Sequence, residues 1–229
     1  MKKTVLLIMV CILMQSCNSK EKDLAQITFT EKYDTFFGDI PNVLDKDYSI
    51  VDAQLYNSYK SESEKTLYFN GVDLSGYRDE KGSFGTNNVR FEFSKNDSVL
   101  NFYYLTLYTQ EKVKKLIENI NNKIGKPVYI STLLSNPENS KPDALLWADK
   151  TSFYLLTGAT QNQSDFVVFN KKNITIREQW LSGPFQYYEN YLEKLEQKKL
   201  KKEAYSYKNF IDEMAKEGRK LYLEKYIKP

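Results

Sequence analysis

The chain has 229 residues, with 41% apolar and 28% charged side chains, a composition typical of a globular domain long enough to bury a core. Its formal charge of +3 is small, so no nucleic-acid partner is expected. The chain has no histidine, two cysteines and no glycine-rich phosphate motif, which excludes Ser-His-Asp triads, Cys-His pairs and histidine metal sites; no cofactor is predicted.

Residues 1–16 have the organisation of a secretory leader. Two lysines precede an apolar run over 4–14, which is as long as the core of a signal peptide and too short to span a bilayer. Ser16 and then Cys17 follow at once. A small residue before a cysteine at this place resembles the lipobox of bacterial lipoproteins. The alternatives are an ordinary secretory leader with an incidental cysteine, or an uncleaved anchor.

The resemblance implies that the leader is removed and that Cys17 carries acyl chains such as palmitate, which anchor the protein to a membrane. Each buried methylene contributes about 0.8 kcal/mol to such an anchor. Residues 17–26 would then form a polar tether. Asn18 instead of Asp after the cysteine, and the charged run after it, resemble sorting signals that favour the outer membrane of a Gram-negative envelope; a plain solvated spacer is the alternative.

Residues 27–182 are predicted to form an α+β domain. Its first part is the hardest to interpret, because the apolar residues there follow neither the two-residue alternation of a strand nor the 3.6-residue period of a helix for long. In chain order the pattern favours a strand at 27–30, a strand or a helix at 48–56, a loop at 61–65, and a strand at 66–72 with a turn or bulge at Asn70-Gly71.

The middle of the chain gives the clearest signals. Segments 88–94 and 99–108 have the residue alternation of β-strands. The turn-forming residues 95–98 join them, so a hairpin is predicted. A helix is predicted over 109–124, with Thr109 as its N-cap and Gly125 just after its end.

After this helix the residues up to 142 look like a loop. A second hairpin is expected at 144–148 and 151–157, then a strand at 165–169 and a last short strand at 174–176. Strand pairs joined by tight turns predict an antiparallel sheet of about five to seven strands with one helix packed on it.

Residues 183–229 are predicted to be helical. Apolar residues are spaced by three and four from Phe185 to Leu195, and a further helix is expected over 207–226. Both faces of segment 99–108 are apolar, so one face should meet helix 109–124 and the other the C-terminal segment. A short coiled-coil seam with a partner is the alternative for the first of these helices.

Three sets of side chains are candidates for function. Carboxylates could act as the acid pair of a glycoside hydrolase, aromatic rings could stack on a sugar or a protein, and the turn Asp97-Ser98-Val99 resembles an O-glycosylation site of exported proteins. The candidate acids are Asp73, Glu80, Glu92, Asp143 and Asp149; the candidate aromatics are Phe91, Phe93, Tyr103, Tyr104 and Tyr108; the glycosylation candidate is Ser98.

The leading hypothesis is a lipid-anchored, non-enzymatic binding or assembly module of a Gram-negative cell envelope. It rests on the leader, the missing catalytic residue types and the aromatic-rich strands, with a protein or a glycan as partner. The first alternative is an envelope glycoside hydrolase that uses two carboxylates. The second is an inhibitor or immunity protein, which the sequence does not distinguish from a binding module.

Overall fold

The computed structural model describes residues 21–45, 52–78, 85–132, 142–199, 201–202 and 204–218. The expected leader, Cys17, Asn18 and Glu80 therefore lie outside the described residues, as does the end of the last expected helix. Within the described residues, no helix is long and apolar enough to cross a membrane.

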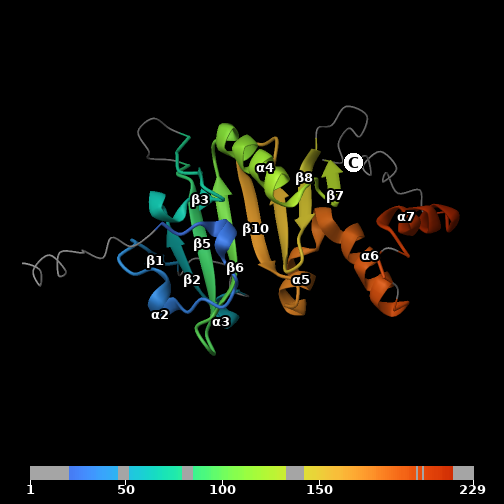
Figure 1. The fold of residues 1–229 in the computed structure, drawn as a ribbon, viewed down its shortest axis with the longest axis horizontal. Helices are drawn as coiled ribbons and strands as arrows, with labels where there is room; N and C mark the ends of the chain where they lie inside the picture. The colour runs from blue at the N-terminus through green and yellow to red at the C-terminus, as the bar shows by residue number, and fades with distance from the viewer. Residues whose placement is uncertain are drawn as a thin grey trace, which may run out of the picture.

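The described residues form an α+β fold built on one large antiparallel sheet, as the sequence predicts (Figure 1). The sheet has eight strands rather than five to seven, in the order β1-β2-β5-β6-β10-β9-β8-β7. The extra strands are short edge segments that alternate too briefly to be recognised. The strands are β1 Val43–Leu44, β2 Tyr56–Ser61, β5 Asn88–Ser94, β6 Leu100–Leu107, β7 Tyr129–Thr132, β8 Pro142–Ala148, β9 Ser152–Thr157 and β10 Ser164–Asn170.

Both predicted hairpins are present, as β5–β6 and β8–β9. In the first, the register shifts because Glu92 pairs with Phe102 while Phe93 pairs with Leu100. One extra residue, Asn101, therefore forms a bulge in β6. The predicted Asn70-Gly71 turn is confirmed too, and it joins the short strands β3 Tyr68–Phe69 and β4 Val72–Asp73.

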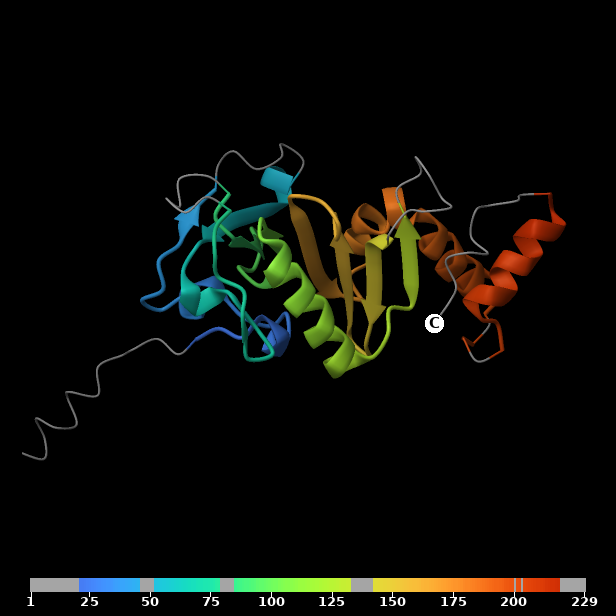
Figure 2. The same cartoon turned by 90° about the horizontal axis from the view of Figure 1, so that it is seen from above.

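The predicted helix is α4, Gln110–Ile124, and it covers one face of the sheet through Val113, Leu116 and Ile120 (Figures 1 and 2). Gly125 follows with φ of 103°, a conformation that favours glycine. Thr109 occupies the N-cap position but makes no capping hydrogen bond. Its hydroxyl instead accepts a hydrogen bond from Asn87 Nδ2 at 3.1 Å, which ties the helix to β5.

The opposite face of the sheet is covered by the C-terminal helices, as the two apolar faces of segment 99–108 predict. These are α5 Ile174–Trp180, α6 Gln186–Gln197 and α7 Tyr207–Lys216, with the short turn η3 Gly183–Phe185 between the first two. The expected strand at 174–176 is wrong: Asn173 caps the backbone N–H of Ile176 and starts α5 there. We call the two faces of the sheet the α4 face and the α6 face.

Two further expectations are corrected. Residues 27–30 form no strand, because Phe29 has φ of 63°, which breaks an extended chain. The stretch before β8 that looked like a loop contains the edge strand β7. The remaining short elements are η1 Leu24–Gln26, α2 Tyr33–Phe36, α3 Asp52–Leu55 and η2 Glu64–Thr66.

The described part of the expected tether over 17–26 makes contacts with the domain from Lys22 onward. The backbone N–H of Lys22 donates to Lys65 at 2.7 Å, and Asp23 pairs with Tyr68 in a β-bridge. Leu24 is 1% exposed and lies in the core under α4. An isolated leucine in a polar run gives no periodic signal, which is why the sequence did not indicate this contact.

Candidate functional site

Three of the five candidate aromatics lie in the core and are not accessible to a ligand. Phe91, Phe93 and Tyr103 are each 0–1% exposed, on the α4 face of the sheet. Strand alternation sends them there, and α2 and α4 then cover them. The Tyr103 hydroxyl donates to the backbone carbonyl of Leu24 at 3.1 Å, which satisfies its polar atom inside the protein. Their expected role as a stacking surface is therefore corrected.

The other two candidate aromatics are half-buried and far from forming one platform. Tyr104 lies on the α6 face, where its ring centre is 5.6 Å from that of Trp180. Tyr108 lies beyond the end of β6, with the guanidinium of Arg78 5.1 Å from its ring centre. The five rings are thus divided between two faces and one strand end.

The described candidate acids each have partners of their own. Asp73 forms an ion pair with Lys112 at 2.8 Å, and Glu92 accepts a hydrogen bond from Ser58 at 2.7 Å. Asp143 accepts from Thr160 and Gln161. Asp149 accepts from Tyr154 at 2.7 Å and from the backbone of Thr151 and Ser152. Burial would raise the pKa of Asp149, but these hydrogen bonds outweigh it and lower that pKa.

These acids are also spread over the molecule. Asp143 lies at the start of β8 and Asp149 just beyond its end, so six residues of extended chain separate them, roughly 20 Å. The acid pairs of glycoside hydrolases are about 5–9.5 Å apart. Asp73 lies beside α4, whereas Glu92 lies on the opposite face of the sheet. Among the described residues, no group of three or more His, Cys, Asp or Glu could hold a metal ion.

Ser98 is exposed at the tip of the β5–β6 hairpin, where its φ is 58°. Asp97 accepts the backbone N–H of Val99 at 3.1 Å and so holds this turn. The position would leave room for a sugar, and glycosylation of Ser98 stays a prediction.

The structure brings together a group of residues that the sequence did not single out. On the α6 face, strands β2 and β5 carry polar side chains, which we call the polar half. Strand pairing sets Ser58 directly opposite Glu92 and Lys60 directly opposite Arg90, so that all four share one face. The polar half consists of Ser58, Lys60, Asn88, Arg90 and Glu92.

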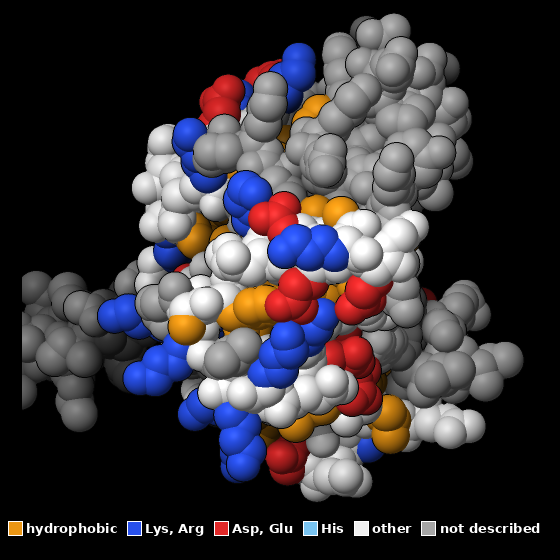
Figure 3. Space-filling view, turned by 90° about the vertical axis from the view of Figure 1, so that its right-hand side faces the viewer, with side chains coloured by type: hydrophobic (Ala, Val, Ile, Leu, Met, Phe, Trp, Pro, Cys, Tyr) orange, Lys and Arg blue, Asp and Glu red, His pale blue; other side chains and the backbone are white. Residues whose placement is uncertain are grey.

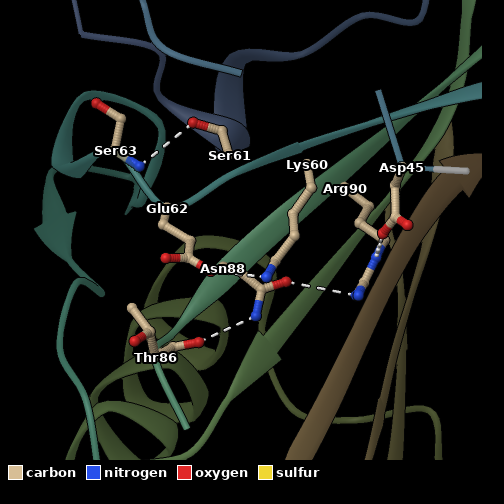
Figure 4. Close-up of polar contacts among 8 residues, drawn as sticks. All are labelled: Asp45, Lys60, Ser61, Glu62, Ser63, Thr86, Asn88 and Arg90. Atoms are coloured by element: carbon tan, nitrogen blue, oxygen red, sulfur yellow. Dashed lines mark hydrogen bonds and ion pairs between the residues drawn. The ribbon is translucent and has the colours of Figure 1, made fainter. Parts of the chain in front are cut away.

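Opposite charges are paired across the polar half (Figure 4). The guanidinium of Arg90 is 2.8 Å from Asp45, and its Nη1 is 3.4 Å from Asn88 Oδ1. Lys60 is 2.6 Å from Glu62, and the two side chains are 33% and 48% exposed. The group thus has two cations, each paired with an acid, and the further carboxyl of Glu92, so it favours a partner with charges of both signs rather than a polyanion.

A cavity of about 570 Å³ adjoins the polar half at the sheet edge. This volume lies in the range of ligand sites, about 300–1,000 Å³. Beside it the edge strand β1 exposes 70% of Val43 and 42% of Leu44. Apolar residues at an open strand edge favour contact with another chain. The cavity is lined by Pro41, Asn42, Val43, Lys60, Ser61, Glu62 and Ser63.

The end of the molecule at α7 looks different. Basic and acidic side chains alternate over it, with apolar areas between them (Figure 3). Its ion pairs include Lys208 with Asp212 at 2.9 Å, one turn apart on the exposed side of α7. This surface therefore has the character of an ordinary solvated helix face.

The sequence contained one signal for the polar half. In segment 88–94 the residues that alternate with the buried aromatics are Asn88, Arg90 and Glu92. Such a strand can be interpreted as having one buried and one polar face. The pairing with Lys60 and Asp45 depends on the strand order, which the sequence does not specify.

Comparisons with known proteins give no further guidance, because no family model, curated protein or solved structure matches this chain. The function therefore has to be argued from the site alone.

Proposed function

We propose that this chain is a lipid-anchored, non-enzymatic binding module of a Gram-negative cell envelope, and that its partner is a protein held at the polar half and the neighbouring edge strand β1. The observation that supports this most is the exposed apolar edge at Val43, next to the cavity and the paired charges of Lys60 and Glu62. An extended segment of the partner would pair with β1 and place one apolar side chain in the cavity.

The chemistry of the region fits protein recognition. An interface commonly combines an apolar contact with a polar rim, and charges of both signs set the orientation of the partner more than its affinity. Anchoring through Cys17 supports the same proposal, since a tethered module meets its partner at a membrane. The hydrolase alternative has less support, because the described candidate acids lie apart and are hydrogen-bonded to neighbours.

Site-specific photo-crosslinking in cells tests the proposal. A photoreactive amino acid at position 43 or 62 should capture one discrete protein. The same group at position 114, on the exposed side of α4, should not capture it. Equal capture from all three positions, or none from 43 and 62, would contradict the proposed surface.

Removal of the exposed charges provides a second test with a matched control. Lys60→Ala with Glu62→Ala should weaken capture from position 43. Lys208→Ala with Asp212→Ala removes a comparable exposed ion pair on α7 and should leave capture unchanged. If both double variants behave alike, the effect does not come from the polar half.

A further inference from the structure

The path of the chain from Cys17 into the domain limits how the molecule can stand on a membrane. From Lys22 onward the chain is fixed: Lys22 donates to Lys65, and Leu24 is buried in the core. Only five residue steps separate Cys17 from Lys22, which span at most about 18 Å when fully extended. A tether over the whole of 17–26 has nine residue steps and would reach about 32 Å by the same measure.

The tether enters on the same side of the sheet as α4. The backbone carbonyl of Leu24 accepts from Tyr103, whose side chain lies on the α4 face. The carbonyl of Ala25 accepts from Lys123 on α4 at 2.5 Å. Figure 2 shows the chain from residue 21 onward on the α4 side of the sheet, while α5 and α6 lie on the other side. Lys22 therefore belongs to the α4 layer.

The depth of the fold exceeds the reach of the tether. Helix and sheet layers are about 10 Å thick, so the outer surface of the α6 layer lies roughly 25 Å from the α4 layer. If α5 and α6 rested on a bilayer, Lys22 would stand roughly 25 Å above it, beyond the reach of about 18 Å. If the side where Lys22 enters the domain faces the bilayer instead, Lys22 lies close to the lipid surface, and residues 17–22 do not need to be extended.

We infer that the side of the domain at η1 and η2, where the chain enters the α4 layer, faces the lipid bilayer, and that α5 and α6 face away from it. This rests on the proposed lipid at Cys17. The short tether then does more than anchor the domain, because it holds the proposed partner surface, whose residues Glu62 and Ser63 adjoin η2, close to the bilayer. A tether of about 32 Å would leave both orientations open.

Bilayer-borne quenching of a fluorophore tests this orientation in vesicles that hold the native lipid-modified protein. Glu64→Cys places a label on η2, next to Lys65, and Glu178→Cys places one on α5; both residues are exposed acids, so the two variants match in charge. The chain has two cysteines, Cys11 in the expected leader and Cys17 as the lipid carrier, so each introduced thiol is the single site for the label.

The label at position 64 should be quenched several-fold more strongly than the label at 178. Insertion of ten Gly and Ser residues after Ser19 should remove most of this difference, because the longer tether admits both orientations. Equal quenching at native tether length, or stronger quenching at 178, would overturn the inference while the lipid anchor stands. Absence of acyl mass on Cys17, with no quenching at either position, would overturn the inference and the proposed function together.

Discussion

The two halves of the α6 face differ although they belong to the same sheet. One row of directly opposed residues runs from Lys60 and Arg90 through Tyr104 to Val167 and Leu155. The row changes from charged to uncharged where β5 meets β6. Over the apolar end, α5 and α6 close a second core, whereas the charged end carries ion pairs and an exposed edge.

This difference shows how a sheet face is divided between stability and recognition. The apolar half, formed by Leu146, Phe153, Leu155, Val167 and Phe169, stabilises the fold because the helices remove it from water. Exposed ion pairs such as Lys60–Glu62 contribute little to stability, about 0–1 kcal/mol. The Lys60–Glu62 pair can therefore change its contacts at small cost, which suits a surface that binds a partner, whereas Ser58, Asn88 and Glu92 of the polar half are buried.

The largest expected effect lies in the apolar half. Phe169 is fully buried, with its ring centre 5.7 Å from that of Phe153. Phe169→Ala should lower the free energy of unfolding by about 3–5 kcal/mol, through lost burial and the cavity left behind. Lys60→Ala should change it by no more than about 0.5 kcal/mol. Urea unfolding of both variants measures the contrast, and equal losses would contradict the division into halves.

The next effect concerns the buried charges of the apolar half. Arg177 lies 3.0 Å from the buried Glu189 and 2.6 Å from Glu196. Arg177→Met should cost roughly 3 kcal/mol, because a buried carboxylate loses its counter-ion. The double variant with Glu189→Leu should recover most of that loss, since no buried charge is left uncompensated. No recovery in the double variant would show that packing of Arg177, rather than its charge, holds α5 to α6.

The parts of the fold that the sequence predicted are those with a local cause. The β5–β6 hairpin follows from alternation and its turn residues, and α4 from its period of apolar residues and Gly125. Segment 174–176 was interpreted as a strand because its isoleucines alternate, yet the Asn173 cap starts a helix there. Local alternation over three residues is too short to outweigh a cap.

The polar half could not be predicted for a different reason. Asp45, Lys60 and Arg90 are far apart in the chain, and only the pairing of β1, β2 and β5 brings them together. The candidate aromatics were uncertain because alternation indicates which rings share a face, but not which face a helix covers. Phe91 and Phe93 proved to be on the face that α4 covers.

A smaller effect is expected within the polar half. Glu92 is fully buried and accepts a hydrogen bond from Ser58 at 2.7 Å. Ser58→Ala should cost about 1–3 kcal/mol, because the buried carboxylate loses that donor. Ser182→Ala removes an exposed hydroxyl that bonds to a backbone carbonyl and should cost less. Chemical denaturation separates the two, and equal costs would mean that Glu92 draws little stability from Ser58.

The smallest expected effect is a pH and salt dependence of α7, which completes the closure of the apolar half. Hydrogen bonds from Lys194 at 2.5 Å and from Tyr205 at 2.7 Å lower the pKa of Glu213 from 4.5 to about 2. A lowered pKa stabilises the folded state above the ordinary value, and this contribution is lost as the pH falls from 4.5 toward 2. The protection factors of the α7 amides, measured by hydrogen exchange relative to the intrinsic rate at each pH, should therefore fall over that range, and less so in Glu213→Gln, whose contacts do not titrate. Added salt should reduce the difference between the two proteins, because these charges are exposed and screened. A pH response that Glu213→Gln retains in full would instead place its origin in carboxylates other than Glu213.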